Sequence, residues 1–161
     1  MKKGQKKSLK MKHFENKSES FFREIRKVII YKASSINYIN NLQGVIPQLM
    51  NAIYSFEVVP ESFSYKMATK TQNKNYLFEL EVNFPLLDLS FETVDFCFDS
   101  FNGDDFAIVF QTNSDQLLFG NDREPIKVEF IDNKKLDNSG NDEYTIALSG
   151  KSIIKPKYTI L

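Results

Sequence analysis

The sequence is poor in the residues that most often build rigid chemical sites. It holds one cysteine, one histidine and no tryptophan. Because Cys97 is the only cysteine, an internal disulfide and a zinc cluster of several thiolates are both excluded. No stretch approaches the roughly 18 apolar residues of a membrane-spanning helix. The Lys-rich N-terminus is not followed by the apolar stretch of a secretory signal, so we expect neither a membrane span nor export.

Glycine and proline are also scarce, at 6 and 5 of 161 residues, whereas 42% of the chain is apolar and 15 residues are phenylalanine. This composition excludes a disordered chain. A chain of this length can bury a substantial core without disulfides or metals. We therefore expect a single folded domain.

The formal net charge of zero hides an uneven distribution. Residues 1–27 contain ten Lys or Arg and three Glu, a net charge of +7. Residues 28–161 contain eleven Lys or Arg and eighteen Asp or Glu, a net charge of −7. This asymmetry predicts a flexible Lys-rich arm over residues 1–19, attached to one acidic, β-rich domain over residues 20–161.

An alternation of apolar and polar residues recurs from residue 55 onward and is typical of half-buried antiparallel strands. The segment 106–110, FAIVF, is continuously apolar and predicts a central strand. Clusters rich in Asn, Asp and Gly separate these segments and predict chain reversals. The apolar faces of the four alternating segments are Tyr76, Phe78, Leu80, Val82 and Phe84; Val94, Phe96 and Phe98, opposite Asp95, Cys97 and Asp99; Ile126, Val128 and Phe130; and Tyr144, Ile146 and Leu148.

The N-terminal part of the domain is less regular. Residues after Ser20 have helical spacing that runs into a strand-like segment at 28–31, and Pro47 is a candidate start for a short helix that ends near Tyr54. The predicted fold is therefore mainly β. We expect an antiparallel β-sandwich or partly closed barrel, with one or two short N-terminal helices and the basic arm.

The basic arm is the first candidate site. Its lysines could neutralise phosphates, but residues 1–19 contain no arginine for reading bases and few aromatics for stacking. An acidic surface on a neighbouring protein is the better expectation, and a solvated tail is the simplest alternative. The predicted partner-binding residues are Lys2, Lys3, Lys6, Lys7, Lys10 and Lys12 of the arm, and Asp95, Asp99, Asp104 and Asp105 of the domain.

No catalytic, cofactor-binding or metal-binding residues are predicted. The segment DSFNGDD around Asp104 and the segment 137–143 both fail the spacing of a calcium-binding EF-hand loop. The only histidine, His13, lies in the arm, and the neighbours predicted for Cys97 are aspartates, which would raise the pKa of a thiol. The sequence also lacks a Gly-rich phosphate loop, GxSxG and HExxH.

Two segments near the C-terminus carry a family resemblance. One is a turn and strand, GN-D-x-x-P-I within FGNDREPIKVEFIDN, and the other is the strand YT-x-x-LSGK within EYTIALSGKSIIKPKYTIL. Together with the preceding strand LFELEVNFPLLD and an Asp-rich segment, their order resembles small β-rich proteins from the tail or neck of tailed bacteriophages, mainly over residues 119–161. The resemblance implies a structural subunit, such as a tail-tube-like or connector protein, and it implies no catalytic residues.

We therefore expect a non-enzymatic structural or assembly subunit of a phage virion, assembled in the host cytoplasm. It would self-associate through sheet edges and loops, and its partners would be further copies or neighbouring virion subunits. The alternative is a monomeric ligand- or carbohydrate-binding β-sandwich module, against which the missing tryptophan and export signal count. A nucleic-acid-binding protein is a third alternative, which the acidic domain disfavours.

Overall fold

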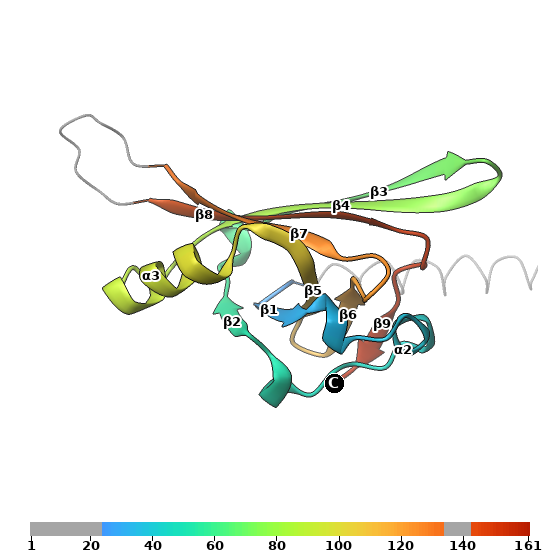
Figure 1. The fold of residues 1–161 in the computed structure, drawn as a ribbon, viewed down its shortest axis with the longest axis horizontal. Coiled ribbons are helices and arrows are strands. Elements are labelled where there is room, and N and C mark those ends of the chain that lie inside the picture. The colour runs from blue at the N-terminus through green and yellow to red at the C-terminus, as the bar shows by residue number, and fades with distance from the viewer. Residues whose placement is uncertain (1–23, 134–142) are drawn as a thin grey trace, which may run out of the picture.

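The computed structural model describes residues 24–133 and 143–161, and most of its regular structure is antiparallel β-sheet. Nine strands form one sheet that curls into a half barrel (Figure 1), so the prediction of a mainly β fold is confirmed. Within the described ranges, two α-helices accompany them, α2 (Tyr38–Gln43) and α3 (Phe91–Ser100). The strands are β1 (Lys27–Lys32), β2 (Tyr54–Glu57), β3 (Ser64–Gln72), β4 (Asn75–Pro85), β5 (Gly103–Gln111), β6 (Asp115–Phe119), β7 (Ile126–Asp132), β8 (Tyr144–Ser152) and β9 (Tyr158–Ile160).

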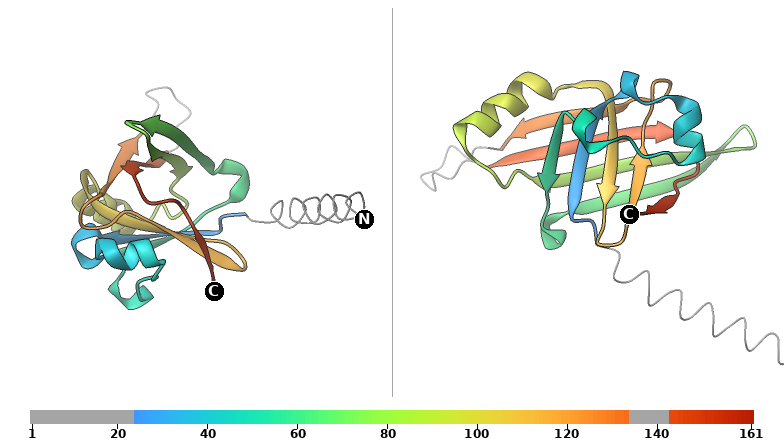
Figure 2. Two further views of the ribbon diagram at one scale, coloured as in Figure 1. Left: turned by 90° about the vertical axis from the view of Figure 1, so that its right-hand side faces the viewer. Right: turned by 90° about the horizontal axis from the view of Figure 1, so that it is seen from below.

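Strand β5 is the point at which the sheet divides. The strands follow the order β2-β1-β5-β7-β8-β4-β3, while β6 pairs with β5 and with β9. On one side β5 pairs with β1 from Phe106 to Gln111. On its other side it pairs first with β7, at Gly103 and Phe106, and then with β6, from Ile108 onward. The sheet thus bends into two limbs, and the strands of one limb run across those of the other (Figure 2, right).

The main core fills the space between the two limbs. One limb contributes residues such as Leu80 and Phe84, and the other contributes residues such as Ile108 and Phe110. Phenylalanines link the layers, since the ring centroids of Phe56 and Phe84 are 5.6 Å apart. Burial of these large side chains is the dominant favourable contribution to folding.

A second, smaller core lies on the opposite face of β1, β5 and β6. There Ile29, Val109 and Leu118 pack with Ile36, while Ile46 lies half-buried against them. The segment between β1 and β2 therefore covers this face of the sheet. Because the central parts of β1 and β5 are buried on both faces, their sequences there, VIIY and FAIVF, are continuously apolar rather than alternating.

The prediction for β4 is confirmed only in its second half. Leu80, Val82 and Phe84 are buried, whereas Phe78 is half-buried. Tyr76 was predicted to be mostly buried, but 66% of its surface is exposed. The reason is that β8 accompanies β4 only from Phe78 onward, so the first residues of β4 lie beyond the core.

The prediction of a strand around residues 94–98 is wrong, because this segment lies within the helix α3. Ser90 caps the helix, since its Oγ accepts a hydrogen bond from the N–H of Thr93 at 3.4 Å. Asp88 reinforces the cap by accepting from the N–H of Ser90 at 3.0 Å and from the hydroxyl of Thr93 at 2.7 Å. In a helix, residues three or four apart share a face, so Cys97 is buried on the inner side of α3 and not exposed on a polar strand face.

The segment before β2 also differs from the expectation in detail. Residues 20–23, the predicted start of the first helix, lie outside the described residues, and the strand-like segment 28–31 forms part of β1. Helix α2 begins after Asn37, whose side chain accepts from the N–H of Ile39 at 2.7 Å, and it ends at Gly44 with φ of 76°. Around the predicted helix after Pro47 the chain forms only a 3₁₀ turn, Leu49–Asn51.

Candidate functional site

The β3–β4 hairpin projects from the body of the molecule. Its two-residue turn consists of Asn73 and Lys74, which both have positive φ, 50° and 67°. This geometry matches the tight turns that follow the twist of an antiparallel pair. Between the turn and Phe78, the hairpin has no third strand beside it among the described residues. Figure 1 shows this part extending beyond the rest of the fold.

The outer edge of β3 is free along its length in the described part of the chain. β3 has nine residues, pairs with β4 without a register shift, and ends the strand order of the sheet. In a hairpin with a two-residue turn, the pair that flanks the turn is hydrogen-bonded and the pairs then alternate along the ladder. Thr69, which lies opposite Phe78, falls in a non-hydrogen-bonded pair. Its backbone N–H and C=O therefore point away from β4, as do those of Met67.

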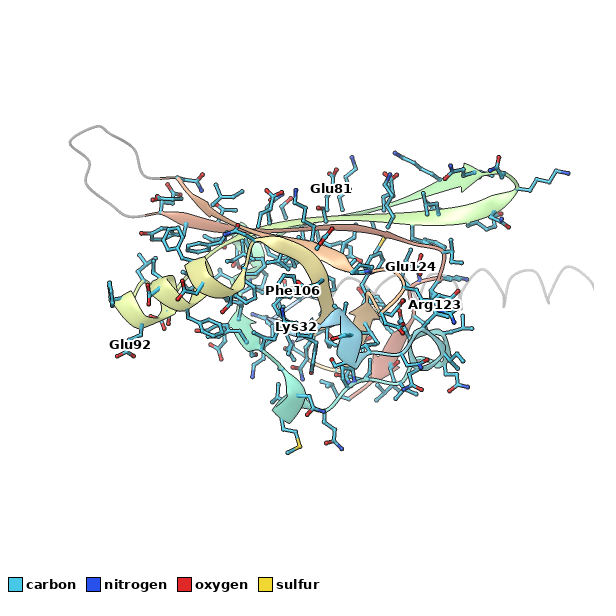
Figure 3. The ribbon with its side chains drawn as sticks, viewed as in Figure 1. Lys32, Glu81, Glu92, Phe106, Arg123 and Glu124 are labelled. Atoms are coloured by element: carbon cyan, nitrogen blue, oxygen red, sulfur yellow. The ribbon has the colours of Figure 1, made fainter. Side chains whose placement is uncertain are left out.

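The outer face of the hairpin carries charged side chains rather than apolar ones. The Glu79 carboxylate lies 2.7 Å from the Lys70 ammonium and 3.6 Å from the Lys151 ammonium. The hydrogen bond from Lys70 holds the pKa of Glu79 below its usual value, and the same contact raises the pKa of Lys70. Glu81 lies on the same outer face and points away from the core (Figure 3). This face is therefore solvated, and the hairpin offers its backbone edge as the more distinctive feature.

The four acids predicted to bind a partner are exposed, but they belong to two different elements. Asp95 and Asp99 lie one turn apart on the exposed side of α3, and Asp99 is in its last turn. Asp104 and Asp105 lie at the start of β5, where Asp105 accepts from the Lys32 ammonium at 2.9 Å. The predicted lysine partners at positions 2 to 12 lie outside the described residues, so their position relative to these acids stays a prediction.

Cys97 lies in the main core and has no surface exposed to solvent. Burial, with a smaller contribution from the Asp88 carboxylate, raises the pKa of its thiol to about 11. At neutral pH the residue is therefore a protonated thiol, which is a poor nucleophile. His13 lies outside the described residues. Within residues 24–133 and 143–161, no group of three or more His, Cys, Asp or Glu side chains is placed to hold a metal ion.

The sequence predicted the segment GNDREP only as a turn, but the structure shows that it joins three parts of the chain. Asn121 is fully buried, and its amide nitrogen donates to the Asn41 side-chain oxygen at 2.9 Å. Asp122 accepts from the backbone N–H of Tyr38 at 2.9 Å, and the Arg123 guanidinium lies 4.9 Å from the Tyr38 ring centroid. These contacts fix α2 and its entry to the turn between β6 and β7.

The same turn also holds the end of β8. The Glu124 carboxylate accepts from the Ser152 hydroxyl and from the backbone N–H of Ile153, both at 2.8 Å. Arg123 and Glu124 lie where α2, the turn and the end of β8 approach one another (Figure 3). Since these contacts span about 80 residues on one side and 28 or 29 on the other, nothing in local spacing could have revealed them.

Comparison with protein-family models, with curated proteins and with solved structures finds no match for this chain. Among the described residues, no helix has both the length and the apolar character that crossing a membrane requires. Inferences about function therefore depend on the geometry of the hairpin, of the acids and of the GNDREP turn.

Proposed function

We propose that this protein is a non-enzymatic structural subunit that associates with further copies of itself, in the tail or neck of a phage virion assembled in the host cytoplasm. The observation that carries this proposal is the free nine-residue edge of β3. An exposed edge offers unpaired N–H and C=O groups to a strand from another chain. Monomeric proteins commonly protect such an edge with proline, a bulge or lysines. β3 contains neither proline nor a bulge, and of its two lysines Lys70 is paired with Glu79 of the neighbouring strand.

A second copy of β3 is a suitable occupant for this edge because two-fold antiparallel pairings exist in which no lysines lie directly opposite one another. When the pairing is centred on Thr69, Lys70 lies opposite Ala68 of the second copy and Lys66 lies opposite its Gln72. A pairing centred on Ala68 would instead oppose Lys66 and Lys70, and like charges directly opposite destabilise a sheet. The side chains therefore favour pairings in which Met67 or Thr69 lies at the centre.

The basic segment 1–19 has a role in the same proposal. Asp95 and Asp99 are like charges at i and i+4, and Asp99 lies at the negative end of the helix dipole, so both effects disfavour α3. A cluster of lysines from a neighbouring subunit would relieve both effects. Asp104 and Asp105 remain in the proposed surface, although Asp105 already has Lys32 as a partner.

The proposed description of the whole domain remains a β-sandwich or partly closed barrel with one or two short N-terminal helices. In such an arrangement the core closes between two layers and leaves sheet edges at the rim. Those edges are then the natural contacts for assembly.

The mass of the protein in solution tests the role of the β3 edge. Thr69→Pro removes an outward N–H without removing a hydrogen bond to β4, and Thr69→Ala serves as the matched control because it keeps that N–H. We expect analytical ultracentrifugation to show oligomers for the wild type and for Thr69→Ala, and a shift toward monomers for Thr69→Pro. A monomeric wild type at tens of micromolar, or equal masses for both variants, would contradict the proposal.

Deletion of residues 1–19 tests the electrostatic part separately. We expect the deletion to lower the assembly state at moderate salt while leaving thermal unfolding of the domain almost unchanged. The double variant Asp95→Asn/Asp99→Asn should have the same effect, whereas Glu81→Gln, on the outer face of β4, should not. If the truncated chain assembles as well as the full chain and is insensitive to salt, the basic segment has no part in assembly.

A further inference from the structure

A pocket of about 460 Å³ lies beside the GNDREP turn. It is bounded by the end of α2, by the end of β6 and by the connection between β8 and β9, so three separate parts of the chain form it. The hydrogen bonds of Asn121 and Glu124 hold two of those parts in place. Its volume is within the range of roughly 300–1,000 Å³ that small-molecule sites occupy.

The amide of Asn41 supplies a fixed hydrogen-bond donor at this pocket. Asn41 lines the pocket, and only 6% of its surface is exposed. Its side-chain oxygen accepts from Asn121, which orients the amide and directs its Nδ2 elsewhere. Among the described residues no partner for this nitrogen is found, yet no fully buried side-chain nitrogen or oxygen lacks a partner. The Asn41 Nδ2 group therefore keeps some exposed surface, and the pocket is the open space that Asn41 lines.

The remaining lining divides into apolar walls and a basic rim. Leu118 and Phe119 are buried residues of β6, and Ile46 and Pro156 extend the apolar surface. The charged side chains of the lining are two lysines, Lys155 and Lys157, both exposed. No carboxylate lines the pocket in the described part of the chain, and that of the adjacent Glu124 is already bound by Ser152 and Ile153.

We propose that this pocket binds a small amphipathic carboxylate. The carboxylate accepts a hydrogen bond from Asn41 Nδ2 and pairs with Lys155 and Lys157, while the hydrocarbon part lies against Leu118 and Phe119. An acceptor on the ligand is favoured because a bound ligand displaces the water that this donor would otherwise contact, and the lost hydrogen bond then has to be replaced. A negative charge is favoured because the rim carries two cations, and the apolar walls favour a hydrocarbon body.

Decanoate is the probe for this proposal, and decanol is its matched uncharged counterpart. The full chain is titrated with each compound at pH 7, and binding is measured by calorimetry and from the side-chain NH₂ signals in NMR spectra. We expect decanoate to bind at least about tenfold more tightly than decanol. That ratio corresponds to one charge-assisted hydrogen bond. Decanoate should also shift the Asn41 side-chain signals. Equal affinities, no binding up to millimolar decanoate, or unshifted Asn41 signals would overturn the proposal.

Two variants locate the site. Asn41→Asp keeps the acceptor for Asn121 but removes the donor and adds a negative charge, so decanoate affinity should fall by about tenfold or more. Lys155→Gln/Lys157→Gln changes two exposed residues, and it tests the proposal even if Asn41→Asp fails to fold. This double variant should lower decanoate affinity several-fold without changing that of decanol. Lys151→Gln, whose side chain pairs with Glu79 outside the pocket, is the control. Decanoate affinity that is unchanged in the double variant would contradict the proposed role of the rim.

Discussion

The inner and outer halves of β4 differ, although a single alternating pattern runs through both. In the inner half, Phe84 is 2% exposed and packs against phenylalanines of other elements, whereas Tyr76 in the outer half is 66% exposed. The two residues lie on the same face of the strand. What differs is the environment, because β8 and the core accompany only the inner half. The pattern thus specifies which face of a strand is apolar, while the neighbouring elements decide how much of that face is buried.

The largest expected effect compares the two halves directly. Phe84→Ala should lower the free energy of unfolding by roughly 3–5 kcal/mol, because it leaves a cavity in the main core. Tyr76→Ala should change it by no more than about 0.5 kcal/mol, as is usual for an exposed site. Urea unfolding of both variants measures the difference. Similar losses for the two would show that the outer half is as tightly packed as the inner half.

The free energy of unfolding of the domain should also decrease at alkaline pH. The unfolded Cys97 thiol titrates near pH 9.0 and the folded one near pH 11, so the folded state binds more protons between these values. Stability is therefore retained below pH 9 and decreases as the pH rises toward 11. For this residue the loss between pH 8 and pH 10 is on the order of 1 kcal/mol.

Cys97→Ala isolates this effect. Burial also raises the pKa values of Tyr31 and Tyr65, so the variant should still lose stability at high pH, but less steeply than the wild type. Urea unfolding at pH 8 and at pH 10 provides the comparison. Equal losses in the wild type and in Cys97→Ala would mean that the thiol is not buried as described.

The helix α3, at one end of the body, should show a smaller effect. Ser90→Ala removes the side chain that caps its first turn, and the expected loss is about 1 kcal/mol. Ser149→Ala, on the exposed face of β8, is the control and should be almost neutral. Thermal unfolding of both proteins provides the test. A neutral Ser90→Ala would indicate that Asp88 alone is sufficient to begin the helix.

The smallest expected effect concerns the tip of the hairpin. Lys74 has a positive φ, and the turn type prefers glycine there, so Lys74→Gly should stabilise the turn by a few tenths to about 1 kcal/mol. Hydrogen exchange at Gln72 and Asn75 should slow several-fold, while the midpoint of global unfolding should hardly move. If the midpoint rises with the exchange protection, the tip unfolds together with the body.

Much of the sheet could be predicted from the sequence, because apolar and polar residues alternate along several strands and the neighbouring elements leave these segments extended. The segments 126–130 and 144–148 lie within β7 and β8, and the continuous run 106–110 lies in the central strand β5. The prediction failed at residues 94–98, where Val94, Phe96 and Phe98 alternate. Ser90 as a cap and Val94, Cys97 and Phe101 at helical spacing were the competing signal.

The candidate sites show a different limit of sequence reasoning. The acids of α3 and β5 could be recognised as exposed from their charge, and the turn at GNDREP from its composition. The pocket could not be recognised in the same way, because Asn41 and Asn121 acquire their roles from a contact between residues 80 positions apart. Likewise, the free edge of β3 is a property of the strand order and not of its residues.

The position of β5 at the division of the sheet also affects how the chain can acquire its structure during synthesis. β1 can pair early with β2, but Ile30 reaches its partner Ile108 only after roughly 80 further residues have been made. At typical translation rates this takes on the order of 4–16 seconds. During that interval the apolar segment VIIY of β1 lacks its main cover and is open to wrong contacts. A chaperone that shields this segment should therefore raise the yield of soluble protein.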